Sequence, residues 1–159
     1  MIMEVNIVKS LNVKVKKLVP QAVIPTYAKP GDAGMDLTAV EYEYDAKTDC
    51  HIYKSGLAFE IPEGYVGLLF PRSSNRKTDA YLTNCVGVIE SGYRGDVMAC
   101  FKNRDKGTDG EINQLSAPYE IGDRFAQLII MPYPSIRLTE AEELSDSERG
   151  TGGYGSTGN

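Results

Sequence analysis

The sequence predicts an all-β domain, built as a sandwich or a barrel. Three observations indicate this class: short apolar runs of strand length recur along the chain, turn-forming residues separate them, and no segment keeps a helical period. A chain of 159 residues is long enough for one domain with a real core. We assign residues 1–148 to the β domain and residues 149–159 to a flexible C-terminal arm, because five of those last residues are glycine.

The expected strands follow one another from the N-terminus to residue 131. Short alternation or an apolar run marks each of them, at residues 5–8, 13–15, 42–44, 57–61, 65–70, 83–89, 97–101 and 126–131. Turns that contain glycine separate them, at residues 30–32, 62–64, 91–92 and 121–123. We expect helical turns only after Pro71 and over residues 139–144, and a long polar surface excursion over residues 102–120.

The charge balance limits the partners. Lys and Arg number 17 against 22 Asp and Glu, a net charge of −5, whereas a general nucleic-acid binder needs a basic surface. No apolar run approaches the roughly 18 residues of a membrane span, and lysines interrupt the N-terminus where a signal peptide would be apolar. We therefore expect a cytoplasmic protein, in the host cytoplasm if the source is viral, without a nucleic-acid or membrane partner.

The cysteines Cys50, Cys85 and Cys100 lack a CxxC spacing. We expect reduced thiols, with Cys85 and Cys100 as small core residues. The single histidine, His51, is adjacent to Cys50, and neighbouring side chains on a strand point to opposite faces. This pair therefore does not indicate a zinc site.

Residues 87–96 carry the strongest functional signal. An apolar strand ends in Glu90, a Ser-Gly turn follows, and Tyr93 begins the return into residues 97–101, which predicts a β-hairpin. Such a hairpin can bind a ring-shaped ligand at its open side. Backbone groups would then contact the edge of the ring, Tyr93 would lie beneath it, and the carboxylate would lie at the border of the site. The plain alternative is an ordinary hairpin with a solvated acid.

Three other segments place polar residues beside strands. Arg72, Ser73 and Ser74 follow a strand, where the serines would cap a helical turn whose free N–H groups face an anion. The alternative is a capped turn with a solvated arginine. Asp36 lies between apolar neighbours. It is either part of a functional site or a buried aspartate that accepts hydrogen bonds from the backbone. Residues 122–127 are typical of a turn that enters a strand.

Together these segments resemble the five ordered motifs of the trimeric deoxyuridine triphosphatases (dUTPases). The motifs are Ala33-Gly-Met-Asp-Leu37, Pro71-Arg-Ser-Ser74, Gly87-Val-Ile-Glu-Ser-Gly-Tyr-Arg-Gly95, Arg124-Phe-Ala-Gln-Leu128 and Arg149-Gly-Thr-Gly-Gly-Tyr-Gly-Ser-Thr-Gly158. The resemblance implies an antiparallel jelly-roll-like fold and a homotrimer whose active sites are shared between subunits. It also implies that the C-terminal arm crosses onto a neighbour's site.

The implied reaction is hydrolysis of dUTP to dUMP and diphosphate, by attack of water on the α-phosphorus with Mg²⁺ on the triphosphate. By resemblance, the base is read mainly by backbone groups in a mouth too narrow for a 5-methyl group. The sugar packs on an aromatic ring that leaves no room for a ribose 2′-hydroxyl. The residues concerned are Asn84, Gly87, Val88, Ile89 and Met98 for the base and Tyr93 for the sugar.

The resemblance also assigns groups to the triphosphate and its metal. They are Arg72, Ser73, Ser74 and Gln127 from the domain, with Arg149, Gly155 and Ser156 from the arm, whose Tyr154 stacks on uracil where the family more often has Phe. Mg²⁺ prefers waters and phosphate oxygens, so Asp36 is expected to act on it through water only. Arg124 is expected to support the site or the subunit contacts.

Glu90 is the main departure from the family pattern, which has Asp here to position and deprotonate the attacking water. Glutamate is one methylene longer, and a misplacement of about 1 Å can cost on the order of 100-fold in rate. We therefore expect normal dUTP binding and slow hydrolysis. Gly92 also replaces an acid that is common in the family, which a turn tolerates.

Two other functions compete with this one. A dUTP-binding regulatory protein with weak or no catalysis would suit Glu90, with residues 102–120 as a contact surface. A dCTP deaminase shares the fold and part of the third motif. It needs a glutamate where this chain has Cys100, however, and it lacks the glycine-rich arm, so the sequence disfavours it.

Overall fold

The computed structural model describes residues 10–104 and 117–153. Within them, ten strands and one short 3-10 helix form an all-β domain, as the sequence predicts. The elements are β1 (Lys14–Lys17), β2 (Met35–Thr38), β3 (Glu41–Asp45), β4 (Cys50–Lys54), β5 (Leu57–Glu60), β6 (Tyr65–Pro71), η1 (Ser73–Lys77), β7 (Ala80–Leu82), β8 (Gly87–Ile89), β9 (Met98–Asn103) and β10 (Arg124–Pro132).

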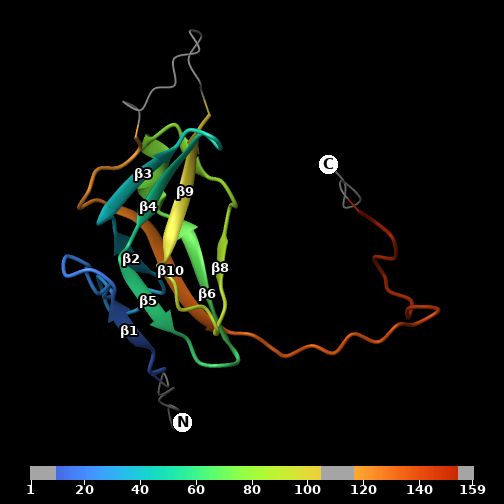
Figure 1. Cartoon of the computed structure of the whole chain (residues 1–159). Coiled ribbons are helices and arrows are strands. Elements are labelled where there is room, and N and C mark those ends of the chain that lie inside the picture. Colours follow the sequence, from blue (N-terminus) through green and yellow to red (C-terminus); the bar gives the residue numbers. More distant parts are fainter. Residues whose placement is uncertain (1–9, 105–116, 154–159) are drawn as a thin grey trace, which may run out of the picture.

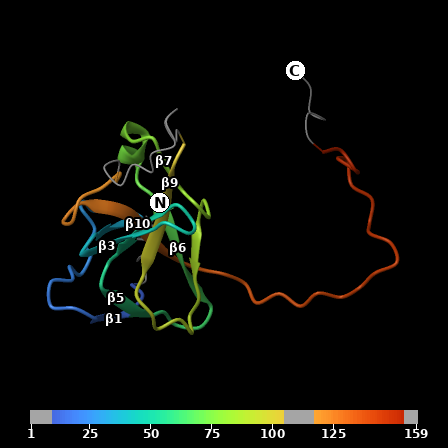
Figure 2. The same cartoon turned by 45° about the horizontal axis from the view of Figure 1, so that its top comes forward.

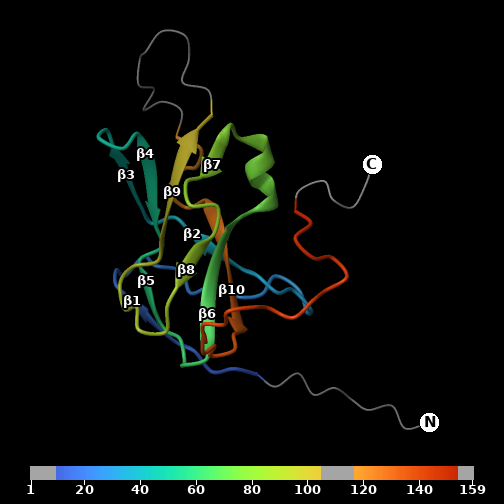
Figure 3. The same cartoon turned by 90° about the vertical axis from the view of Figure 1, so that its right-hand side faces the viewer.

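The strands form two four-stranded sheets and one two-stranded ribbon, all antiparallel. The first sheet has the order β2-β10-β6-β8, the second sheet has the order β3-β4-β9-β7, and the ribbon joins β1 to β5. In Figure 3, β4 and β9 lie on one side of the domain and β6 and β10 on the other. Because the chain switches repeatedly between two facing antiparallel sheets, the expected jelly-roll-like fold is confirmed.

The core lies between the two four-stranded sheets. Tyr53 and Phe101 of the second sheet and Leu37, Phe125 and Leu128 of the first are fully buried. The rings of Tyr53 and Phe125 are stacked with their centroids 5.9 Å apart, so an aromatic contact joins the sheets directly. Large apolar side chains from both sheets thus hold them face to face.

The predicted hairpin over residues 87–101 is wrong in its pairing. β8 pairs with β6 in the first sheet, whereas β9 pairs with β4 and β7 in the second. Residues 90–97 therefore cross from one sheet to the other. The turn signal in the sequence specifies a local change of direction, but burial against distant strands decides which partner each strand takes.

The apolar run predicted as one strand over residues 83–89 is also interrupted. β7 ends at Leu82, the amide of Cys85 donates to the carbonyl of Leu82 at 3.0 Å, and β8 starts only at Gly87. Cys85 has a φ of 59° and is exposed, so its prediction as a core residue is wrong. The short strands β2, β4 and β7 are absent from the expected set. Polar residues interrupt the apolar patterns of β2 and β4, and β7 is only three residues long.

The two predicted helical turns have different outcomes. The turn after Pro71 forms η1, but residues 139–144 form no helix. Residues 5–8 and most of the polar excursion over residues 102–120 lie outside the described residues. Tyr119, near the end of that excursion, is buried in the core against Tyr53 and Phe101, so the surface prediction is wrong there.

After β10 the chain leaves the sandwich. Residues 133–153 run away from it as an extended segment in all three views (Figures 1, 2 and 3). Ile136, Leu138 and Leu144 on this segment are 78%, 90% and 89% exposed. Across residues 10–104 and 117–153, no helix is long and apolar enough to cross a membrane.

Candidate functional site

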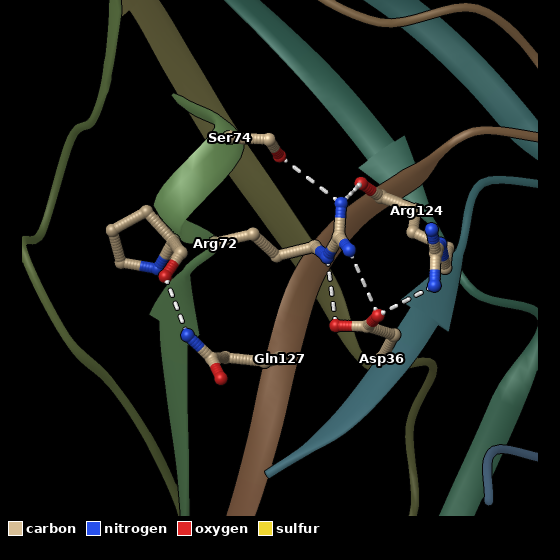
Figure 4. A network of polar contacts seen from close by, with 6 residues as sticks. Asp36, Arg72, Ser74, Arg124 and Gln127 are labelled. Carbon is tan, nitrogen blue, oxygen red and sulfur yellow. Dashed lines mark hydrogen bonds and ion pairs between the residues drawn. The ribbon is translucent and has the colours of Figure 1, made fainter. Parts of the chain in front are cut away.

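The residues that the sequence singles out gather in two regions of the first sheet. One region is the arginine–carboxylate cluster, which consists of Asp36, Arg72, Ser74 and Arg124 (Figure 4). β10 brings its members together, because it pairs with β2 on one side and with β6 on the other. The second region is the free edge of β8 and the crossing segment that follows it.

Arg72 makes the principal contact of the cluster. Its Nε donates to Asp36 Oδ1 at 2.7 Å and its Nη2 donates to Asp36 Oδ2 at 2.9 Å, a bidentate pair. Its Nη1 donates to Ser74 Oγ at 3.0 Å and to the Arg124 carbonyl at 3.3 Å. Four hydrogen bonds therefore fix the plane and position of this guanidinium.

A bulge in β10 aims the second arginine. The β2–β10 register shifts between Arg124 and Ala126, so that both Phe125 and Ala126 are buried and Arg124 lies beside the carboxylate. Arg124 Nη1 donates to Asp36 Oδ2 at 3.2 Å, and its side chain is 58% exposed. Two guanidinium groups surround one carboxylate, so the cluster has an excess positive charge that suits an anion.

The donors around Asp36 bear on the expected metal role. Its two oxygens accept three guanidinium hydrogen bonds, and an ionised carboxylate has about four lone-pair sites. The Asp36 carboxylate can therefore accept about one more hydrogen bond. A water bound to Mg²⁺ is the donor expected there. Within the described part of the chain, no group of three or more His, Cys, Asp or Glu residues could hold a metal ion alone.

The serines of this region do not cap the helical turn, contrary to the sequence prediction. Arg72 occupies the N-cap position of η1 without a side-chain cap, and Ser73 and Ser74 lie inside the turn. Ser74 instead accepts from Arg72, as described above. Arg72 has an extended backbone, with φ −82° and ψ 158°, and the 3-10 conformation begins at Ser73.

Sequence reasoning missed the role of Asn75. Its Nδ2 donates to the Ala80 carbonyl at 2.8 Å, and its Oδ1 accepts from the Tyr119 hydroxyl at 2.8 Å. Thr78 Oγ1 donates to the same Oδ1 at 3.1 Å. Asn75 thus ties η1 to β7 and to the core. Only its position directly after the two serines hinted at such a role.

Gln127 is bonded to the end of β6 and lies close to Gly34. Its Nε2 donates to the Pro71 carbonyl at 3.0 Å, at the junction between β6 and η1 (Figure 4). On the other side a side chain at Gly34 would come within 2.7 Å of Gln127 Oε1. The glycine of the first motif therefore lets the Gln127 amide approach the backbone in its present position. The phosphate contact expected for Gln127 stays a prediction.

β8 lies at the edge of the first sheet, since β6 is its only neighbour among the described strands. An edge strand exposes backbone N–H and C=O groups that a ligand can use. A side chain at Gly87 would be crowded, because it would come within 3.1 Å of Leu69 Cβ, and the Asn84 amide lies close by. Val88 and Met98 are 60% and 40% exposed, whereas the side chain of Ile89 is buried. Two of the residues predicted to read the base are thus accessible, and Ile89 packs into the core.

The crossing segment, residues 90–97, presents Glu90 and Tyr93. Both are exposed, and the Tyr93 amide donates to the Glu90 carbonyl at 3.0 Å, which closes the turn. The Tyr93 hydroxyl donates to the Asp96 carbonyl at 2.9 Å. The ring covers Gly95 so closely that any side chain there would collide with it. The Tyr-x-Gly spacing therefore has a steric reason.

The two regions are far apart within one chain. Ile89 pairs with Gly67, so Glu90 lies near the start of β6, while Arg72 follows its end. Arg72 lies six positions after Val66, which corresponds to about 20 Å of extended strand. A single chain therefore does not bring Glu90 next to Arg72.

The arm is described only at its start. Arg149 Nε donates to the Gly152 carbonyl at 3.1 Å in an exposed turn, where Gly150 has a φ of 53°. Tyr154, Gly155 and Ser156 lie outside the described residues, and the contacts expected of them stay predictions.

Known proteins resemble this chain over most of its length. A model of the dUTPase family matches residues 20–158. A deoxyuridine 5'-triphosphate nucleotidohydrolase of Thermobifida fusca is 35% identical, over 94% of this chain and 80% of that protein. The protein of the same name from Clostridioides difficile is 38% identical, over 92% and 98%. A solved dUTPase of Staphylococcus bacteriophage 80alpha with dUPNHPP is 31% identical, with a TM-score of 0.76, over 94% and 100%.

Proposed function

Because this chain belongs to the dUTPase family, we propose that it hydrolyses dUTP to dUMP and diphosphate, through attack of water on the α-phosphorus. The observation that carries the proposal is the arginine–carboxylate cluster, which supplies a fixed guanidinium and an excess positive charge on the same sheet as the open edge of β8. A triphosphate needs the guanidinium and the positive charge, and the edge of a pyrimidine needs the open strand edge.

The cluster would hold the triphosphate. Arg72 and Ser74 are oriented before any ligand arrives, so little ordering is needed when phosphate oxygens bind. Ser73, Gln127 and Arg149 would add further donors. Bound Mg²⁺ would neutralise charge on the phosphate oxygens, and Asp36 would accept a hydrogen bond from one of its waters.

The edge of β8 would read the base. Backbone groups of Gly87, Val88 and Ile89 can pair with the edge of uracil, assisted by the Asn84 amide and the backbone of Met98. Tyr93 would pack against the sugar. Selection against thymine and against ribonucleotides would then follow from the lack of space for a methyl group or a 2′-hydroxyl.

Glu90 would be the general base for the attacking water. Its carboxylate has the required basicity, but the extra methylene displaces it from the place where the family has Asp. A displacement of about 1 Å can lower the rate on the order of 100-fold. We therefore propose that turnover is slow while binding of dUTP is normal.

We infer a homotrimer in which each site combines residues of different subunits. The separation of Glu90 from Arg72 supports this, since a neighbour must supply one of the two groups. The exposed apolar residues Ile136, Leu138 and Leu144 also need cover, which a neighbouring subunit can provide. Residues Tyr154, Gly155 and Ser156 would then close over that neighbour's nucleotide.

The three cysteines are unpaired, which is consistent with a cytoplasmic enzyme that acts on the nucleotide pool. Diphosphate release from dUTP with Mg²⁺ tests the proposal, with dTTP, dCTP and UTP as controls. We expect release from dUTP to be much faster than release from any of the three controls. Equal release from all four nucleotides, or ammonia release from dCTP, would contradict it.

A regulatory function is the second candidate, and the glutamate at position 90 favours it. A chain maintained for nucleotide-dependent binding tolerates a slow catalytic step. Tight dUTP binding without any diphosphate release would support this alternative over the enzyme.

A further inference from the structure

We propose that Asp96 is a positioning residue that holds the crossing segment, and with it Tyr93, in the place that discriminates deoxyribose from ribose. The inference rests on the proposed function, because it concerns how the sugar-packing residue is held. Asp96 itself lies outside the set of residues expected to touch substrate.

The Asp96 side chain anchors one end of the crossing segment to the turn between β4 and β5. Its Oδ1 accepts from Ser55 Oγ at 3.2 Å and from the Leu57 amide at 3.3 Å. Backbone bonds continue this attachment: the Ser55 amide donates to the Val97 carbonyl at 3.1 Å, and the Val97 amide donates to the Leu57 carbonyl at 2.9 Å. Ser55 and Leu57 are fully buried, so the anchor point is rigid.

The anchoring turn depends on a glycine in tightly packed surroundings. Gly56 has a φ of 66°, and a side chain there would overlap Val19 and Val40. Burial raises the pKa of Asp96, against the opposing effect of hydrogen bonds from Ser55 and the backbone. Burial of a charged group costs more free energy than burial of a neutral one. A neutral acceptor of the same shape, such as an asparagine side chain, would therefore be buried here at lower cost.

The same residue also holds Tyr93. The carbonyl of Asp96 accepts the Tyr93 hydroxyl at 2.9 Å, and the ring lies over Gly95. Because Tyr93 is 42% exposed, packing alone does not fix its ring. Arg94 Nη1 donates to the carbonyls of Ser91 and Tyr93, which braces the segment as a unit. A shift at Asp96 would thus move the whole segment and its tyrosine.

The test compares Asp96→Ala, which removes the acceptor, with Asp96→Asn, which retains it. We expect Asp96→Ala to lower the ratio of kcat/KM for dUTP to kcat/KM for UTP about tenfold, through a higher KM for dUTP with nearly unchanged kcat. Asp96→Asn should keep the ratio within about twofold. Equal behaviour of the two variants, or an unchanged ratio in Asp96→Ala, would overturn the inference.

Asp45→Ala is a matched control. Asp45 also accepts two hydrogen bonds, from the Lys47 amide and Thr48 Oγ1 of the following turn, but it is the last residue of β3, outside the crossing segment. Asp45→Ala should lower the stability of the protein without changing the ratio of kcat/KM for dUTP to kcat/KM for UTP. If Asp45→Ala changes the ratio as much as Asp96→Ala, loss of a turn anchor anywhere is sufficient and the proposal fails.

A second readout separates this inference from the proposed activity. Hydrogen exchange of the Tyr93 and Val97 amides needs no turnover, and Asp96→Ala should speed it while Asp96→Asn should not. Unchanged exchange of these amides in Asp96→Ala overturns the inference, whether or not the chain hydrolyses dUTP. If the unaltered protein does not hydrolyse dUTP, only the proposed activity is overturned. If Asp96→Ala fails to fold, Tyr93→Phe tests the other end of the attachment, and unchanged discrimination there also overturns the inference.

Discussion

Asp36 and Arg72 form a bidentate ion pair, with Nε–Oδ1 and Nη2–Oδ2 distances of 2.7 and 2.9 Å, although 36 residues separate them in the chain. The pair joins β2 to the end of β6 across β10 and leaves Arg72 oriented toward Ser74. The Asp36 side chain is 27% exposed and that of Arg72 is 20% exposed, so the interaction is less screened by solvent than an ordinary surface pair. Pre-orientation of this arginine is the main feature that favours a phosphate ligand.

Loss of the Asp36–Arg72 pair should weaken catalysis more than binding of the base. Asp36→Asn retains the shape but removes the charge that holds two arginines, and hydrogen bonds to charged groups contribute about 1.5–3 kcal/mol. We expect kcat/KM for dUTP to fall roughly 10- to 100-fold, while binding of deoxyuridine stays unchanged. Steady-state kinetics and calorimetry measure the two effects, and equal losses in both would contradict this account.

The two arginines of the cluster should respond differently to lysine. Arg72→Lys loses a planar group that makes four hydrogen bonds, whereas Arg124→Lys loses one contact on an exposed side chain. We expect a loss in kcat/KM of about tenfold or more for the first and less than about threefold for the second. A larger effect at Arg124 would show that it contacts the substrate directly.

Shortening Glu90 should accelerate hydrolysis. In the proposed mechanism the extra methylene of Glu90 displaces the base, so Glu90→Asp should raise the single-turnover rate, by up to about 100-fold. Glu90→Gln serves as the control, because it keeps the length and removes the basic group. No gain from Asp would mean that the methylene is not what limits the reaction.

Mixed subunits should reveal whether sites are shared. Glu90→Gln and Arg72→Ala proteins are each expected to be inactive alone. When they are refolded together, activity should return, because some sites then take an intact Glu90 from one subunit and an intact Arg72 from another. Sedimentation of the unaltered protein should give a trimer. A monomer, or mixtures without activity, would refute a site built from several subunits.

Acidification should destabilise the protein through His51. Burial lowers the pKa of this side chain, whose Nδ1 lies 3.0 Å from the Tyr42 hydroxyl. Between that lowered pKa and the unfolded value near 6.5, the unfolded chain binds more protons, so the free energy of unfolding decreases as the pH falls. Urea unfolding from about pH 7.5 to about pH 5.5 should show this slope, and His51→Gln should flatten it.

An equal slope in the His51→Gln protein would assign the acid sensitivity to carboxyl groups instead. The chain has one histidine, so its ring signals in NMR spectra report the titration without ambiguity.

Local chemistry made much of this protein predictable. Gly31, Gly64 and Gly122 occupy the expected turns with φ values of 91°, 81° and 94°, a region that only glycine enters freely. The apolar runs that begin at Leu57 and Tyr65 form strands as predicted. The motif order alone indicated the family.

Partner choice, in contrast, depended on the tertiary structure. Nothing near β8 in the sequence indicates that it pairs with β6 while β9 joins the other sheet, or that Cys85 turns outward. The bidentate contact of Asp36 with Arg72 and the anchoring of Asp96 on the buried Ser55 likewise join residues far apart in the chain. Periodicity and turn residues act over a few neighbours, whereas strand pairing is decided by which distant surfaces must be buried together.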